Sequence, residues 1–262
     1  MTVLIATCAL LGLLIGSFLN VVVHRVPRGE SVVRPASRCP GCEREILRRD
    51  NVPVLSWLVL RGRCRGCGVP ISVRYPLVEV GTAAVFTALG WVVGPSAALP
   101  AYLYFGAIAV ALALIDLDVR RLPDAIVKPS YLVALVLLAA ASAGTGDWGA
   151  YGRALVGGAG LWFLYQVTVI VKPGGMGYGD VKLAGVLGLY LGWWGWDALV
   201  VGAFAGFLIG GVVGVAVLLT GGSLKTKVPF GPSMLLGAFL ALFIASPVAQ
   251  WYLGMAGIAP SV

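Results

Sequence analysis

The sequence predicts an all-α polytopic membrane protein of about eight transmembrane helices, with a cysteine-containing loop between the first helix and the second. Hydrophobic residues make up 59% of the 262 residues and charged residues only 11%. The mean hydropathy is +0.94, whereas soluble domains carry about 25% charged residues. The chain also repeats apolar stretches near the roughly 20 residues that cross a bilayer. These predicted spans are 3–23, 77–94, 98–115, 126–143, 152–171, 181–195, 198–220 and 232–254.

Two of the predicted spans need separate arguments. The apolar run 3–23 is too long for a cleaved signal peptide and lacks a charged segment before it, while Arg25 and Arg28 follow it. We therefore expect residues 1–23 to be a retained first span with its N-terminus outside. The segment 181–195 is short and rich in glycine, so we expect it to be tilted, half-inserted or packed inside the bundle.

The basic residues predict the orientation of these spans. In this topology 18 of the 19 lysines and arginines lie on one side of the membrane, and only Arg153 lies on the other. The positive-inside rule makes the basic side cytoplasmic. Basic loops beside anionic lipid account for the net charge of +8, and we expect no nucleic-acid partner.

Two aspartates lie at the cytoplasmic membrane edge in this topology. Asp116 follows the apolar run Ala107–Ile115, and Asp180 ends a glycine-rich segment that precedes another apolar stretch. Ionisable residues at such depths are costly, so they are functional candidates by default. Two neighbouring carboxylates cannot both ionise cheaply and share one proton. One can then activate water while the other donates to a substrate carbonyl.

The loop 24–76 carries two Cys-x-x-Cys pairs, Cys39–Cys42 and Cys64–Cys67, separated by 21 residues. Four thiolates in this pattern predict a tetrahedral zinc site. A loop of this length can form only a small hydrophobic core. We therefore expect the bound metal to contribute to its folding. Redox pairs or disulfides are the alternative, which a cytoplasmic location disfavours.

The remaining side chains give little support to other hydrolytic chemistries. His24 is the only histidine and lies where the first span meets the loop, as an interfacial anchor would. The chain has no Gly-x-Ser-x-Gly and no His-Glu-x-x-His sequence, so neither a serine hydrolase nor a zinc metalloprotease is indicated.

Several ordered motifs resemble the type IV prepilin leader peptidase family, the bifunctional prepilin peptidase/N-methyltransferases, over nearly the whole chain. The motifs are Gly16-Ser17-Phe18-Leu19-Asn20, Cys39-Pro40-Gly41-Cys42, Cys64-Arg65-Gly66-Cys67, Ile115-Asp116-Leu117-Asp118 with Leu122-Pro123-Asp124, Gly177-Tyr178-Gly179-Asp180, and Pro229-Phe230-Gly231-Pro232. The family consists of intramembrane aspartic proteases of the Gly-x-Gly-Asp type. The resemblance therefore implies a membrane aspartic peptidase domain over 77–262.

The resemblance implies that Asp116 and Asp180 are the catalytic pair. Asp116, and not Asp118, has the family's interval to Pro123-Asp124. Asp118 is expected to be a supporting carboxylate that pairs with Lys182 or with a nearby arginine.

The neighbours of the two aspartates have simpler expected roles. We expect Asp124 to cap the fourth span. Gly177 and Gly179 would let an extended substrate backbone approach the site.

The resemblance further implies a prepilin or pseudopilin substrate whose short basic leader, ending in Gly, precedes an apolar helix. Cleavage would take place at the cytoplasmic face of the bacterial inner membrane. The family then methylates the new N-terminus with S-adenosylmethionine, an activity associated with the loop 24–76. No S-adenosylmethionine fingerprint is visible in the sequence. Glu79, Asp50 and Asn51 are candidate polar contacts for that reaction, although Glu79 could instead pair with Arg74.

Two other classes of protein remain open from the residues alone. In a transporter, Asp116, Asp118 and Asp180 would bind a cation or relay protons. The acids cluster at one membrane face and no inverted repeat is apparent, which argues against it. A non-catalytic membrane protein that binds a partner through its zinc loop is the other alternative, and it leaves the aspartates unexplained.

Overall fold

The computed structural model of the protein describes residues 1–221, 223 and 228–256. They form helices and turns, and the only β-structure among them is two isolated bridges, Arg38 with Glu45 and Arg63 with Pro70. The chain divides into two compact units, Met1–Ala111 and Leu112–Val262. The predicted all-α fold class is confirmed, and so is the position of the cysteine loop between the first two long helices.

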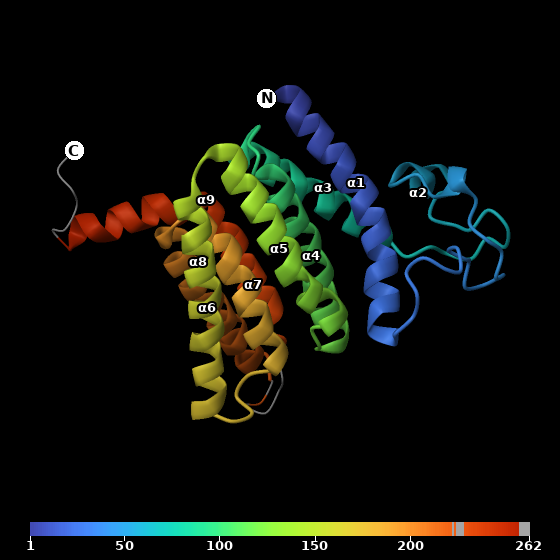
Figure 1. Ribbon diagram of the computed structural model, residues 1–262. Coiled ribbons are helices and arrows are strands. Elements are labelled where there is room, and N and C mark those ends of the chain that lie inside the picture. The colour runs from blue at the N-terminus through green and yellow to red at the C-terminus, as the bar shows by residue number, and fades with distance from the viewer. Residues whose placement is uncertain (222, 224–227, 257–262) are drawn as a thin grey trace. The chain divides into compact units, whose positions relative to one another are not determined.

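The first unit is built on helices α1 (Thr2–Arg25) and α3 (Arg74–Val93), which pack side by side (Figure 1). Small residues permit this contact. A Cβ atom on Gly12 would lie 2.6 Å from the Cα of Ala83, and one on Gly16 would lie 2.7 Å from the Cα of Glu79. Such close backbone approach is how membrane helices associate when lipid is as apolar as their side chains.

The loop between α1 and α3 contains only short elements. These are η1 (Val26–Arg28), η2 (Arg48–Asp50) and the five-residue helix α2 (Leu55–Val59). Helix α4 (Leu99–Val119) begins in the first unit and ends in the second.

The second unit surrounds helix α7 (Tyr178–Trp194), which contacts four other helices. These are α5 (Asp124–Thr145), α6 (Trp148–Val171), α8 (Trp196–Leu219) and α9 (Gly231–Met255). Glycines set the closest contact, since a Cβ atom on Gly188 of α7 would lie 2.3 Å from the carbonyl oxygen of Gly157 on α6.

Seven helices in the described part of the chain are long and apolar enough to cross a membrane, one fewer than the predicted eight. The exception is α7, where we expected the span 181–195. It has 17 residues and is therefore about 25 Å long, shorter than the ~30 Å hydrocarbon core. Twelve of those residues are buried, so α7 packs inside the bundle.

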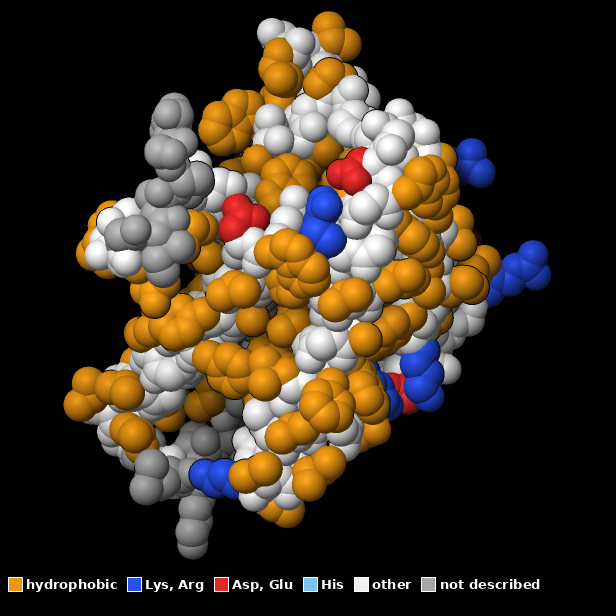
Figure 2. All heavy atoms as spheres, turned by 60° about the vertical axis from the view of Figure 1, so that its left-hand side comes forward, with side chains coloured by type: hydrophobic (Ala, Val, Ile, Leu, Met, Phe, Trp, Pro, Cys, Tyr) orange, Lys and Arg blue, Asp and Glu red, His pale blue; other side chains and the backbone are white. Residues whose placement is uncertain are grey.

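The surface of the helices suits a lipid environment. Figure 2 shows a face on which hydrophobic side chains predominate and charged side chains are few. Phe204 and Val212 on α8 are examples of large apolar side chains that are exposed. Two basic residues used in the predicted topology, Lys225 and Lys227, lie outside the described residues.

Candidate functional site

Asp116 lies in the last turn of α4 and is buried, with 5% of its surface exposed. Its Oδ2 accepts a hydrogen bond of 3.1 Å from the backbone N–H of Gly231, the first residue of α9. Helix α4 ends at Val119, and Arg120 then adopts a left-handed φ of 53° while its N–H still bonds to the carbonyl of Asp116. The carboxylate is thus held between the end of one helix and the start of another.

Asp180 lies inside the first turn of α7, two residues after the helix begins and not before it as the sequence suggested. It is also buried, with 9% of its surface exposed. Its Oδ2 accepts a hydrogen bond of 3.2 Å from the N–H of Gly177, and its own N–H donates to the carbonyl of Gly177 over 3.0 Å. This reciprocal pair closes the turn around the glycine motif and fixes the carboxylate at the helix N-terminus.

The structure brings Asp116 and Asp180 together in the second unit, near enough for their charges to interact. Leu122 lies beside both backbone segments that position these carboxylates, the start of α7 and the start of α9. A Cβ atom on Gly179 would lie 3.1 Å from the Cβ of Leu122, and one on Gly231 would lie 3.4 Å from its Cδ2. The two buried carboxylates therefore share one compact site at the ends of α4, α7 and α9.

An aromatic cluster adjoins this site. The ring of Tyr165 on α6 lies 5.1 Å from that of Phe207 and 6.5 Å from that of Phe230, the residue before Gly231. Tyr165 is also close enough to Asp180 to interact with its charge. The sequence analysis missed this cluster and the role of the Gly231 N–H. The only sign of either was the motif Pro229-Phe230-Gly231-Pro232.

Among the residues near the pair, Asp124 is arranged differently from our expectation. Asp124 does not cap α5 with its side chain, because its carboxylate forms ion pairs of 2.7 Å with both Lys128 and Lys182. Asp118 is exposed, in contrast to buried Asp116. The bond from Lys182 to Asp124 joins α7 to α5, two residues after Asp180.

Tyr131 adds a second bond between the same two helices. Its hydroxyl donates to the carbonyl oxygen of Lys182 over 2.6 Å. The hydroxyl also fills the space beside Gly185, where a Cβ atom would lie 2.1 Å from it. Helices α5 and α7 are therefore joined by a neutral hydrogen bond as well as by an ion pair.

The two cysteine pairs form turns of the same geometry. The N–H of Cys39 bonds to the carbonyl of Arg44, and the N–H of Cys64 bonds to that of Val69. A residue with positive φ follows each pair, Glu43 at 54° and Gly68 at 73°. Each turn thus presents its two thiols to the same centre.

The four sulfur atoms have the spacing that a zinc ion requires. They lie within 4.8 Å of one another, and the Sγ atoms of Cys39 and Cys67 are 3.7 Å apart. Zn–S bonds of about 2.3 Å in a tetrahedron place sulfur atoms about 3.8 Å apart. The residues therefore fit the predicted metal.

The thiols of the second pair are electrostatically unequal. Backbone N–H groups of Cys67 and Gly66 lower the pKa of Cys64 to about 6. At Cys67 a hydrogen bond from the Val69 backbone lowers the pKa, but loss of solvent and the neighbouring thiols outweigh it and raise the pKa to about 11. Without metal, the group holds one thiolate readily and resists forming another.

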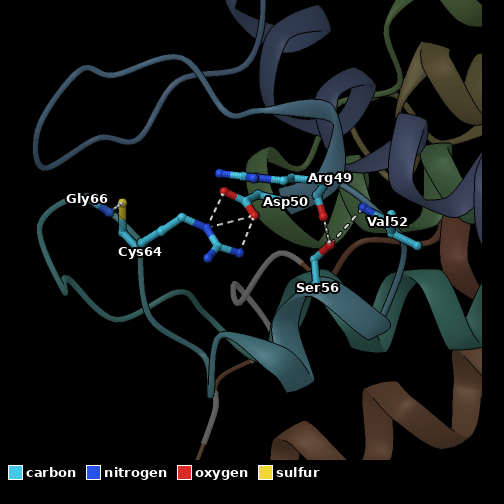
Figure 3. A network of polar contacts seen from close by, with 7 residues as sticks. Arg49, Asp50, Val52, Ser56, Cys64 and Gly66 are labelled. Carbon is cyan, nitrogen blue, oxygen red and sulfur yellow. Dashed lines mark hydrogen bonds and ion pairs between the residues drawn. The ribbon is translucent and has the colours of Figure 1, made fainter.

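Asp50 and Glu79 both have partners within the first unit. Asp50 accepts hydrogen bonds of 2.7 to 3.0 Å from the Nε and Nη2 of Arg65, next to Cys64 (Figure 3). Glu79 is buried, and its Oε2 accepts a 2.7 Å bond from the N–H of Val54. Val54 has φ 61° and ψ −51°, and the N–H of Leu55 bonds to the carbonyl of Pro53 over 2.6 Å. These values describe a strained γ-turn, which Glu79 holds in place.

Comparison with known proteins shows the family. Residues 10–93 match the Bacterial Peptidase A24 N-terminal domain, and residues 103–219 match the type IV leader peptidase family. A prepilin leader peptidase/N-methyltransferase of Aeromonas hydrophila is 37% identical, over 93% of this chain and 92% of its own length. A protein with the same name from Pseudomonas putida is 38% identical, over 91% of this chain and 90% of its own length. Another from Pseudomonas aeruginosa is 34% identical, over 95% of this chain and 93% of its own length. No solved structure matches the chain.

The chain therefore belongs to the type IV leader peptidase family, as its motifs indicated. This membership, together with seven helices able to cross a membrane, defines a multi-pass membrane protein of a peptidase family. It does not favour a transporter or a non-catalytic zinc protein.

Proposed function

We propose that this chain cleaves the leader peptide of type IV prepilins or pseudopilins after the leader's Gly and then methylates the new N-terminus. One observation carries the peptidase proposal. Two buried carboxylates from different helices, Asp116 and Asp180, lie within electrostatic reach of each other, and one backbone N–H holds each of them. The name shared by the relatives supports both activities.

In the proposed mechanism the two carboxylates share a single proton. The ionised one removes a proton from a water molecule, whose oxygen attacks the scissile carbonyl carbon, while the protonated one donates to the carbonyl oxygen. When the C–N bond breaks, the leaving amine takes up the proton that the first carboxylate removed from water. The second carboxylate regains its proton from a hydroxyl of the tetrahedral intermediate. The backbone bonds from Gly177 and Gly231 engage Oδ2 of each carboxylate, so we assign the water and the substrate to Oδ1.

The substrate would lie with its apolar helix in the membrane and its basic leader in the cytoplasm. The basic loops around the aspartate pair support a site at the cytoplasmic face of the bacterial inner membrane. Gly177 has no side chain to obstruct an extended peptide at the start of α7, whereas Leu122 occupies the space beside Gly179. Acidic side chains at the site also complement a basic leader.

For methylation, S-adenosylmethionine would supply the methyl group and the new N-terminal amine would attack it. The four cysteines would hold structural zinc and so order the loop. Asp50, Asn51 and Glu79 stay predictions as contacts for this step. The bonds from Arg65 to Asp50 and from Val54 to Glu79 show that both carboxylates also organise the loop.

The test is cleavage of a prepilin by the purified protein in detergent, with S-adenosylmethionine present and mass spectrometry as the readout. We expect wild type to give a product cut after Gly that carries one added methyl mass. Asp116→Asn and Asp180→Asn should each abolish cleavage without loss of zinc. Asp118→Asn is the matched control and should still cleave. Retained cleavage in either buried-aspartate variant would refute the assignment.

A further inference from the structure

The first unit contains a groove of about 320 Å³ between α1 and the loop that follows it. One wall is a single face of α1 that includes Leu14, Phe18, Val21 and, at the end of the helix, Arg25. The groove is open at the surface, because Leu14 is 60% exposed and Phe18 is 48% exposed. The opposite wall comes from the loop and is mainly apolar, with Val32, Val33, Pro35 and Pro53 among its residues.

The groove lies along a membrane-spanning helix and not beyond its end. From Leu14 to Arg25 the axial rise is about 16 Å, which matches half of the ~30 Å hydrocarbon thickness. The groove is therefore as long as one leaflet is deep. The part of the groove along Leu14, Phe18 and Val21 is apolar, as acyl chains require, and the end at Arg25 is cationic, as an anionic headgroup requires.

The loop wall also lies at this depth. Val54 donates its N–H to Glu79, and Glu79 of α3 lies against Gly16 of α1. Gly16 is nine residues, or about 14 Å, before the end of α1 at Arg25. A glutamate side chain is too short to span that distance, so Val54 lies beside α1 and not beyond its end.

Helix α2, which begins directly after Val54, exposes apolar side chains at the same level. Leu58 is 57% exposed and Val59 is 75% exposed, and Leu55 is exposed as well. In water this would be an unfavourable surface for a five-residue helix. Beside a membrane span it is the expected surface for contact with acyl chains.

We infer that the groove between α1 and the loop holds an anionic phospholipid of the leaflet at the Arg25 end of α1, with an acyl chain against Leu14, Phe18 and Val21 and the phosphate at Arg25. The positive charge of Arg25 disfavours cationic occupants of the groove. A basic leader peptide would meet Arg25, and so would the sulfonium cation of S-adenosylmethionine. This lipid site belongs to the first unit, and its occupancy does not require the aspartate chemistry.

The test is native mass spectrometry of the full-length protein purified in mild detergent with added phosphatidylglycerol or, separately, phosphatidylcholine. We expect wild type to retain one phosphatidylglycerol in preference to phosphatidylcholine. Arg25→Gln should weaken this retention about fivefold, the effect of one basic residue at an anionic surface, and Arg25→Lys should restore it. Val21→Trp should fill the groove and reduce retention while keeping every charge.

Two controls make the outcome decisive. Arg48→Gln removes one exposed arginine from the same loop outside the groove and should leave retention unchanged. A phosphatidylglycerol that carries a photoreactive group in its acyl chain should label peptides containing residues 14–25 and 55–59 in nanodiscs. Any of three results would overturn the proposal. Arg25→Gln and Arg48→Gln could reduce phosphatidylglycerol retention equally, Val21→Trp could leave retention unchanged, or a prepilin could displace the photoreactive lipid.

Discussion

Gly231 donates its backbone N–H to the carboxylate of Asp116 across 115 residues of sequence, with an N–O distance of 3.1 Å. The bond connects the last turn of α4 to the first residue of α9. A Cβ atom on Gly231 would lie 2.7 Å from Oδ2 of Asp116, so only glycine permits this approach. The position of the first proposed catalytic carboxylate therefore depends on a residue far away in the chain.

We expect Gly231→Ala to reduce prepilin cleavage at least tenfold, because the added methyl group must displace the Asp116 carboxylate from its donor. A shift of about 1 Å in a catalytic group can cost up to 100-fold in rate. Gly214→Ala on α8 is the matched control, since a Cβ atom there meets no atom within 4 Å. Cleavage kinetics for both variants check the prediction, and equal rates would contradict it.

The sequence predicted the parts of the site that depend on local pattern. The cysteine spacing, the glycine motif at Asp180 and the interval from Asp116 to Pro123 are short-range features, so they were visible without a structure. The bond from Gly231 and the ion pair of Lys182 with Asp124 join distant segments, so they were not. Packing of α7 inside the bundle was only one of the options open for the run 181–195, because a short apolar run does not show which neighbouring helices bury it.

Lys182→Met should lower both thermal stability and the cleavage rate, because it removes the ion pair that joins α7 to α5 next to Asp180. We expect only a small loss of stability, since the Asp124 side chain is 44% exposed and solvent screens the pair. We also expect a several-fold loss of cleavage, because the start of α7 carries Asp180. Lys182→Arg should recover part of both losses.

Lys128→Met is the control for this ion pair. Lys128 also pairs with Asp124 at 2.7 Å, but the two residues lie one turn apart on α5, so their bond joins no second helix. Melting temperatures in detergent and cleavage rates should separate the two variants. Equal effects would mean that the charge of Asp124, and not the connection between the helices, is what matters.

Gly188→Ala should destabilise the second unit strongly. A Cβ atom there would lie 2.3 Å from the carbonyl oxygen of Gly157, and backbone cannot move aside as a flexible side chain can. Overpacking of this kind costs about 1–3 kcal/mol. Gly160→Ala on α6 faces open space and should change stability by less than about 1 kcal/mol. Thermal unfolding monitored by circular dichroism in detergent would measure both, and a tolerated Gly188→Ala would show that α6 and α7 can separate at no cost.

Cys39→Ser should lose zinc and impair methylation more than cleavage, because the cysteines lie in the first unit and the aspartate pair lies in the second. Cys8→Ser is the control, since Cys8 is buried on α1 outside the four-cysteine group and should keep zinc. Metal analysis and a combined cleavage and methylation assay check the result. Zinc loss with unchanged methylation would contradict the link.

Zinc affinity should also rise with pH across the neutral range. Cys64, with a pKa of about 6, is already a thiolate at neutral pH, whereas Cys67, with a pKa of about 11, must release a proton to bind metal. Lower pH therefore favours the protonated, metal-free thiols. Competition with a chromogenic chelator at several pH values would measure the trend, and a pH-independent affinity would contradict it.

Asp50→Asn should accelerate zinc loss, because the Asp50 carboxylate fixes Arg65, which lies between Cys64 and Cys67 in the sequence. Hydrogen bonding to Arg65 holds the pKa of Asp50 below its usual range. The stabilisation is therefore complete above the ordinary carboxyl pKa and disappears as the pH falls through the lowered value. Glu45→Gln makes the same change of charge at an exposed position of the loop and should leave the rate unchanged. The rate of zinc transfer to a chelator at neutral pH decides between them. If Asp50→Asn releases zinc no faster than Glu45→Gln does, the contact with Arg65 orders the loop independently of the metal.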